Sequence, residues 1–210
     1  MSGRGSRDGA RVRGVVFDVG NVMVRWDPRT LYSKIFPDPA ERDWFLSHVC
    51  TMDWHMAHDA GVSFADNRDR LTARFPEHAA AIAAWRERWD EMFSGPIPET
   101  ETAIEAMAAW GVPMFGLTNM PAEVDAMVFA MSPVFGHLKH IVVSAREGTV
   151  KPQPRIFEIV CERAGMAPPE LLFVDDSAVN IAAARALGFD VHRFDDPAAL
   201  RPALEARGLL

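Results

Sequence analysis

The sequence predicts an α/β protein with a doubly wound, Rossmann-like parallel sheet and an inserted all-α helical cap. Two observations lead to this fold class. Short apolar runs alternate with segments whose apolar residues recur at helical spacing. Glycine follows four of these segments, where it commonly ends a helix, at Gly111, Gly165, Gly188 and Gly208. Near-continuous apolar strands separated by helices are typical of parallel sheets covered on both faces.

Five apolar runs are expected to form the strands, at 14–18, 112–118, 140–144, 171–175 and 190–194. Helical periodicity predicts helices at 99–110, 122–131, 153–164, 178–187 and 197–206. Between 28 and 95 this alternation stops, and only amphipathic helical patterns occur. We therefore expect an α/β core formed by 14–27 and 96–210, interrupted by a helical cap at 28–95. Asp27 and Pro28 have the residue types that cap and begin a helix, so we expect them to start the first cap helix.

Composition narrows the possible partners and compartment. Residues 1–13 are polar, basic and rich in glycine and lack the apolar stretch of a signal peptide, so we expect a disordered leader. The net charge of −7 argues against nucleic acid and acidic membranes as partners. No apolar run approaches the ~20 residues of a membrane span. Two cysteines are too few for a disulfide framework. We expect a cytoplasmic protein, a monomer or a homodimer, that acts on a small molecule.

Polar side chains end three of the expected strands. Asp18, Thr118 and the pair Asp175-Asp176 each follow an apolar run, and Lys151 lies in the loop between two expected elements. The carboxyl ends of parallel strands meet at one edge of a sheet, so these groups should share one crevice. The aspartates and Thr118 have ordinary explanations as turn or helix caps, and Lys151 as a solvated lysine, but two adjacent carboxylates repel each other unless a cation neutralises them. Together they predict a phosphoryl-transfer or related hydrolytic site.

The order of these groups along the chain distinguishes between two kinds of site that use similar residues. A receiver domain places its acidic pair first, whereas here the single aspartate comes first and the pair last. This order resembles the haloacid dehalogenase (HAD) superfamily, whose four motifs are matched by Asp18, Thr118, Lys151 and Asp175-Asp176. The chain looks most similar to the branch of small phosphatases that act on sugar phosphates such as α-D-glucose 1-phosphate. The likeness is carried by the segments 17–22, 26–28, 117–119, 150–152 and 174–180.

The resemblance implies a Mg²⁺-dependent phosphatase of a small phosphorylated metabolite such as a sugar phosphate. By this resemblance, Asp18 attacks phosphorus and forms an aspartyl-phosphate that water then hydrolyses. Magnesium would be held by Asp18, the backbone carbonyl of Gly20 and Asp175, with Asp176 reaching it through water.

The remaining groups of the motifs would bind the phosphoryl oxygens. The Thr118 hydroxyl, the Asn119 backbone N–H and Lys151 would contact these oxygens, where charge is spread in the transition state. Asp18 and Lys151 are therefore the expected catalytic residues. Asn180, one helical turn after the acid pair, is expected to orient that pair or, equally simply, to be an exposed helix residue.

One position departs from the superfamily pattern. Many of its phosphatases carry a second aspartate two residues after the nucleophile, as general acid and base, and here that position is Gly20. A cap residue or water could move the proton instead, or the substrate could have a leaving group that hardly needs one, such as an anomeric phosphate. The cap offers His55, His58 and Asp59, although the simplest interpretation packs this helix through Trp54 and Met56 with both histidines at the surface.

Further expectations concern the cap and two other functions. Trp85, Trp89, Met92 and Phe93 are expected to form the core of the cap rather than a binding site. A 2-haloacid dehalogenase shares the aspartate nucleophile, but needs no metal and lacks paired aspartates. A protein that binds a phosphorylated ligand without turnover is the other alternative.

Overall fold

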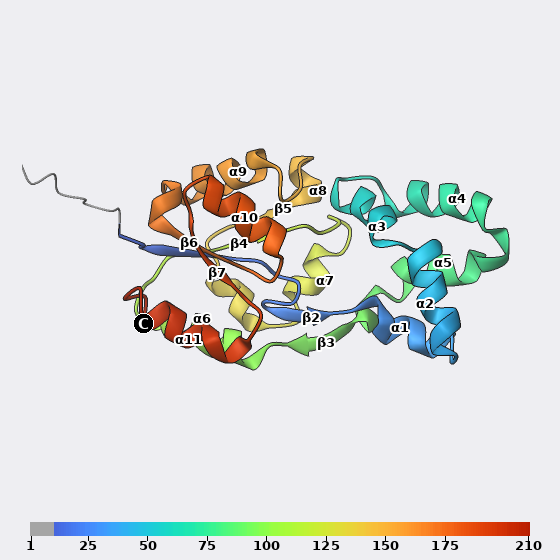
Figure 1. The fold of residues 1–210 in the computed structure, drawn as a ribbon, viewed down its shortest axis with the longest axis horizontal. Coiled ribbons are helices and arrows are strands. Elements are labelled where there is room, and N and C mark those ends of the chain that lie inside the picture. Colours follow the sequence, from blue (N-terminus) through green and yellow to red (C-terminus); the bar gives the residue numbers. More distant parts are fainter. Residues whose placement is uncertain (1–10) are drawn as a thin grey trace, which may run out of the picture.

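The computed structural model describes residues 11–210, and its parallel sheet lies at one end of an elongated molecule (Figure 1). Within these residues the main sheet has five parallel strands in the order β5-β4-β1-β6-β7. They are β1 (Gly14–Phe17), β4 (Met114–Thr118), β5 (Ile141–Val143), β6 (Leu171–Asp175) and β7 (Asp190–Arg193). All five expected strands are present, and the doubly wound α/β fold class is confirmed.

The strand order places β1 at the centre of the sheet, where the direction of winding reverses. The chain moves from β1 outward through β4 to β5, then returns to the other side of β1 for β6 and β7. Phe17, the last residue of β1, pairs with Gly116 on one side and Val174 on the other. The residues that follow these three therefore lie level with one another, at the switch point where open α/β sheets bind ligands.

Helices cover both faces of the sheet because successive strand residues point to opposite sides. Val16, Phe115 and Phe173 pack with α9 (Pro154–Ala164) and α10 (Ala178–Ala186). Val15, Phe17 and Leu172 face the opposite cluster, which includes α6 (Pro98–Ala109), α7 (Asp125–Phe129) and α11 (Leu200–Glu205). The result is a three-layer core with a rigid central strand that ends beside Asp18.

Five helices form a second body, the helical lobe (residues 28–92), at the other end of the molecule (Figure 1). They are α1 (Pro28–Ile35), α2 (Pro39–His48), α3 (Met52–Asp59), α4 (Phe64–Arg74) and α5 (Ala79–Glu87). Asp27 caps α1 by accepting a hydrogen bond from the Arg29 N–H at 2.8 Å, and Pro28 is its first residue, as predicted. Trp85 and Met92 are buried in the lobe, which confirms their assignment to its core.

An antiparallel ribbon joins the lobe to the sheet, and the sequence did not predict it. It pairs β2 (Val24–Trp26) with β3 (Phe93–Pro96), so the expectation of an all-helical stretch through 95 was wrong for its last residues. Strand β3 is short and contains both glycine and proline, which are rare in strands. It forms because β2, distant in sequence, supplies its partner.

Smaller differences concern helix lengths and the start of the chain. Helix α7 is shorter than the expected 122–131, and the short α8 (Ser144–Glu147) was not expected at all. Most of the predicted leader, 1–13, falls outside the described residues, but the Arg13 N–H donates to the Glu170 carbonyl at 2.8 Å. Within residues 11–210, none of the helices combines the length and apolar character needed to cross a membrane.

A buried hydroxyl links the helical lobe to the sheet. Ser144, the first residue of α8, is fully buried. Its Oγ accepts a hydrogen bond from the Met120 N–H at 3.0 Å and donates one to the Asp59 carbonyl at 2.6 Å. The end of α3 is thereby held beside the loop that follows β4.

We expect Ser144→Ala to lower the free energy of unfolding by about 1–3 kcal/mol, because it leaves a buried N–H and a buried carbonyl without this partner. Denaturant unfolding measures the change, with Ser94→Ala, at an exposed position, as the control. Equal stability of the two variants would show that Ser144 does not carry this link.

Candidate active site

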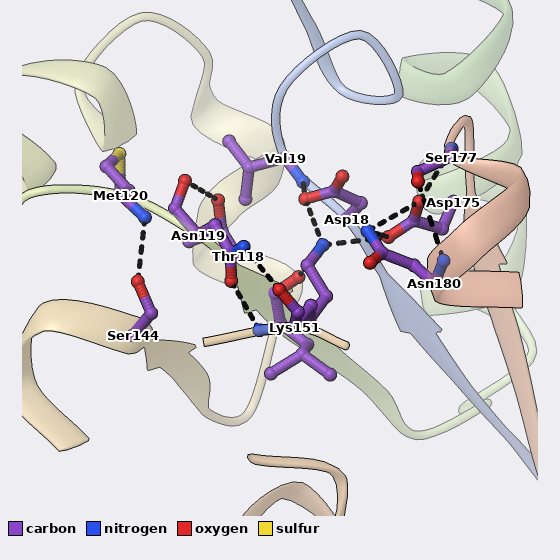
Figure 2. A network of polar contacts seen from close by, with 11 residues as sticks. Asp18, Val19, Thr118, Asn119, Met120, Ser144, Lys151, Asp175, Ser177 and Asn180 are labelled. Carbon is purple, nitrogen blue, oxygen red and sulfur yellow. Dashed lines mark hydrogen bonds and ion pairs between the residues drawn. The ribbon is translucent and has the colours of Figure 1, made fainter. Parts of the chain in front are cut away.

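The structure brings the motif residues together at the carboxyl edge of the sheet. Asp18 follows β1, Thr118 ends β4, Asp175 ends β6, and Lys151 lies between α8 and α9. The Lys151 Nζ lies 2.8 Å from Asp18 Oδ1 and 2.8 Å from Asp175 Oδ2 (Figure 2). It also donates to the Leu117 carbonyl at 3.0 Å. One ammonium group therefore contacts groups at the ends of three adjacent strands.

These charged groups are buried, which changes their protonation. Burial opposes the charge on Lys151, but the carboxylates of Asp18 and Asp175 outweigh it and raise the lysine pKa. Burial raises the pKa of Asp18 to about 8; Lys151 opposes this shift, while Asp175 and Asp176 add to it. Lys151 is thus a fixed cation, and Asp18 needs more positive charge nearby to be ionised at neutral pH.

The acidic groups fit a divalent cation. Asp18, Asp175 and Asp176 each offer one carboxylate oxygen, and these three oxygens lie within 4.8 Å of one another. Three carboxyl groups lie beside the single ammonium group of Lys151, so the cluster can bind a further cation. Oxygen donors without sulfur or imidazole suit hard ions such as Mg²⁺. Gly20, the fourth expected ligand, lines the same cavity.

Asn180 and Ser177 hold Asp175 in place. The Asn180 Nδ2 lies 3.1 Å from each carboxylate oxygen of Asp175, and the Ser177 N–H donates to Oδ1 at 2.8 Å (Figure 2). The prediction that Asn180 orients the acid pair is confirmed for Asp175. An exposed-surface role for Asn180 is excluded by these contacts.

Asn119 has a structural role that the sequence did not reveal. Its side-chain Nδ2 donates to the Lys151 carbonyl at 3.0 Å, and its Oδ1 accepts from the Lys151 N–H at 2.8 Å (Figure 2). The side chain therefore pairs with the backbone of the lysine loop as a neighbouring strand would. Thr118, directly before it, is buried beside the same cavity.

A cavity of about 260 Å³ lies between this edge of the sheet and the helical lobe. Its polar floor includes Asp18, Asn119 and Lys151, and its walls are largely apolar. The apolar side chains come from both parts of the chain: Trp26, Met56, Trp89, Phe93, Met120 and Val128. Trp89 and Phe93, expected only as lobe core, also line the cavity, so that expectation was incomplete.

The histidines of α3 are buried, contrary to the expectation that they lie at the surface. His55 is 4% exposed and His58 1%, whereas Met56, expected to pack inside, is 50% exposed. The helix is rotated relative to the expected orientation because its histidine face packs against aromatic rings. The ring centroids of His55 and Trp26 lie 5.3 Å apart, and those of His58 and Phe64 lie 4.3 Å apart. Asp59 is buried beside them and lines the cavity.

The comparisons with known proteins agree with this geometry. The model of the haloacid dehalogenase-like hydrolase family matches residues 12–188. A phosphoglycolate phosphatase from Pectobacterium atrosepticum is 30% identical over 191 residues, 84% of this chain and 77% of that protein. Other curated relatives match over shorter stretches, which span 6% to 36% of their own lengths.

Solved structures share the fold. A HAD family enzyme from Bacteroides thetaiotaomicron, in complex with magnesium and inorganic phosphate, has a TM-score of 0.67 at 20% identity, covering 90% of this chain and 98% of that chain. An L-2-haloacid dehalogenase from Xanthobacter autotrophicus has a TM-score of 0.63 at 17% identity, covering 95% and 85%. The chain belongs to the haloacid dehalogenase-like hydrolases and is an enzyme of that family.

We expect Asn119→Ala to lower the free energy of unfolding by about 1–3 kcal/mol, because the Lys151 N–H and carbonyl lose their partner. Asn119→Asp should also lower stability, since its second carboxylate oxygen faces the Lys151 carbonyl oxygen with no proton to donate. Urea denaturation of both variants tests this. An alanine variant as stable as wild type would mean that the lysine loop is held by other contacts.

Proposed function

We propose that this chain is a Mg²⁺-dependent phosphatase that hydrolyses a small phosphorylated metabolite through an aspartyl-phosphate on Asp18. One observation carries the proposal: the Asp18 carboxylate lies 2.8 Å from a buried lysine, beside two further carboxylates, at the floor of a cavity. A carboxylate nucleophile beside a fixed cation, with further carboxylates to hold a divalent ion, is suited to attack a phosphate ester, which is itself an anion.

The neighbouring groups have complementary roles. Lys151 Nζ holds Asp18 through Oδ1 and places positive charge beside the incoming phosphoryl group. The Thr118 hydroxyl and the Asn119 N–H would donate hydrogen bonds to its oxygens. A magnesium ion held by Asp18, Asp175, Asp176 and the Gly20 carbonyl would reduce the repulsion between the phosphate and Asp18. The phosphoglycolate phosphatase relative, and the magnesium and phosphate complex of a protein with this fold, support this assignment.

The cavity favours an ester whose organic part is uncharged. Among the described residues that line it, Lys151 is the one lysine or arginine, and its ammonium is already bound to two carboxylates and a carbonyl. A substrate carboxylate, such as that of phosphoglycolate, would find no free cation there. Aromatic walls and a small volume suit the face of a sugar ring or a similar small group. We therefore propose a sugar phosphate rather than phosphoglycolate.

The two alternatives differ from this proposal in what they require. A dehalogenase would have to bind the carboxylate of a haloacid in a site that already holds three carboxyl groups. A non-catalytic binder would have no use for Asp18 held by Lys151 in a position to attack. Both remain distinguishable by assay.

Replacement of the nucleophile is the first test. With Mg²⁺ and p-nitrophenyl phosphate or glucose 1-phosphate, Asp18→Asn should release phosphate at least about 10³-fold more slowly than wild type, because an amide is a poor nucleophile. Asp195→Asn, at an exposed position, is the control and should match wild type. Chloride release from 2-chloropropionate in the presence of a chelator would instead identify a dehalogenase.

The metal can be tested without turnover. Mg²⁺ should raise the free energy of unfolding of the wild type by about 2.7 kcal/mol at 100 times its Kd, because it binds only the folded acid cluster. Asp175→Asn should remove most of this gain, and Asp195→Asn should retain it. An equal Mg²⁺ effect in all three proteins would place the ion elsewhere.

A further inference from the structure

We propose that Asp59, on the helical lobe, is the general acid that protonates the leaving group and the general base that then activates water. The inference rests on the proposed phosphatase function and supplies the group missing at Gly20. Asp59 is the last residue of α3, is 5% exposed and lines the cavity that holds Asp18. It therefore approaches the substrate from the side opposite the sheet.

Asp59 lines the cavity that holds Asp18, although its side chain is almost fully buried. Its Oδ1 is buried and, among the described residues, makes no hydrogen bond. His55 Nε2 lies 3.4 Å from this oxygen without forming a hydrogen bond, and a buried polar atom left without one costs stability unless a ligand supplies it. The Asp59 backbone, in contrast, is fixed by the hydrogen bond from Ser144 at 2.6 Å.

The segment after Asp59 adds to this fixed position. Gly61 has a φ of +101°, and a Cβ there would lie 3.2 Å from the Ala145 carbonyl oxygen. Only glycine meets both conditions easily, so α3 ends close against α8. The Asp59 side chain is thus presented to the cavity from a backbone held on both sides.

The surroundings of Asp59 suit both steps of the reaction. Burial raises its pKa to about 7, and the charge of Lys151 opposes the rise. At neutral pH the carboxyl group is therefore populated in both its acidic and its basic form, which is the condition for giving and recovering a proton. His55 of the same helix is the other titratable group that faces it.

The two histidines are less suited to this role. His58 has both ring nitrogens occupied: Nδ1 lies 3.3 Å from the Val62 carbonyl and Nε2 lies 3.1 Å from Asn67 Nδ2. Burial, with a smaller effect of His58, lowers the pKa of His55 to about 3, so its ring is neutral and has no proton of suitable acidity. His55 instead packs beside Asp59 on the same helix.

Asp59 gives up and recovers one proton as the bonds to phosphorus break and form. As the Asp18 carboxylate attacks phosphorus, the bond from phosphorus to the ester oxygen breaks, and the Asp59 carboxyl gives its proton to that oxygen. The alcohol leaves, and Asp59 is a carboxylate. It then takes a proton from the water that attacks phosphorus, the bond to Asp18 breaks, and inorganic phosphate departs with both aspartates restored.

Asp59→Asn tests the assignment because the amide keeps the shape of the side chain and cannot give a proton. Two esters of similar size are compared with Mg²⁺ present: benzyl phosphate, with a poor leaving group, and p-nitrophenyl phosphate, with a good one. A positioned acid contributes ~10²–10⁴-fold, mostly with poor leaving groups. We expect a loss of that order for benzyl phosphate, and a burst of nitrophenol followed by slow turnover for p-nitrophenyl phosphate. Asp53→Asn, at an exposed position of α3, should behave as wild type.

Gly20→Asp can restore a general acid from the sheet side of the site in a protein that lacks the Asp59 carboxyl group. A Cβ at Gly20 meets no atom within 4 Å, and its φ lies outside the left-handed range. The double variant Gly20→Asp with Asp59→Asn should hydrolyse benzyl phosphate at least about tenfold faster than Asp59→Asn alone, because a carboxyl group again lies beside the leaving group. Asp59→Glu keeps a carboxyl group, so its ratio of benzyl phosphate to p-nitrophenyl phosphate hydrolysis rates should match that of the wild type.

The outcomes separate this inference from the proposed function. A wild type that hydrolyses neither ester would overturn the phosphatase function itself. If the wild type is active and Asp59→Asn slows release of the alcohol in the first turnover equally for both esters, or raises only KM, then Asp59 binds substrate and is not the acid. Circular dichroism and thermal unfolding show whether the variant is folded; if it is not, the Asp59→Glu variant decides, and loss of the ester preference in that folded variant would overturn the assignment.

Discussion

The buried contacts of Lys151 with Asp18 and Asp175 are the interaction on which this molecule depends. One ammonium binds groups at the ends of β1, β4 and β6, so it fixes the three central strands relative to one another at the edge where the site lies. Removing one member of a buried ion pair typically costs 3–5 kcal/mol, because the other charge is left uncompensated. The loop that carries Lys151 is itself held by the Asn119 side chain. The groups proposed to carry out the reaction are therefore also the groups that stabilise this edge of the sheet.

The two parts of the chain contribute differently to the site. The sheet supplies a fixed set of charges whose positions follow from strand register. The helical lobe supplies part of the aromatic wall and two buried titratable groups, His55 and Asp59, whose pKa values burial shifts toward their neutral forms. In the proposed mechanism, phosphate binding therefore depends on the sheet, while recognition of the organic part and movement of its proton depend on the lobe. The Ser144 contact, the ribbon and the hydrogen bond from the Phe64 N–H to Glu123 together hold the lobe beside the sheet.

The sequence predicted the features that depend on local pattern. The five strands follow from apolar runs, and the position of Asp18 beside the acid pair follows from the order of parallel strands. The pairing of β2 with β3 was not predictable, because neither short segment has a strand pattern and their pairing depends on a contact across the whole lobe. The burial of His55 and His58 was missed for a related reason: a short helix with apolar and polar residues on several faces takes its rotation from its neighbours. The side-chain role of Asn119 likewise required knowing which loop lies beside it.

The ribbon has a consequence for how this enzyme could change over evolutionary time. Val24 pairs with Pro96 and Arg25 with Gly95, so the chain leaves the sheet and returns to it at neighbouring points. An insertion whose two ends lie side by side can be lengthened, shortened or replaced without pulling the flanking strands apart, because the geometry at its base stays the same. Selection for a new substrate could therefore act on residues 28–92 while the charges at the strand ends remain untouched. The ribbon also carries Trp26 and Phe93 at its lobe end, where they form two walls of the cavity, so an exchanged lobe would inherit part of the old pocket.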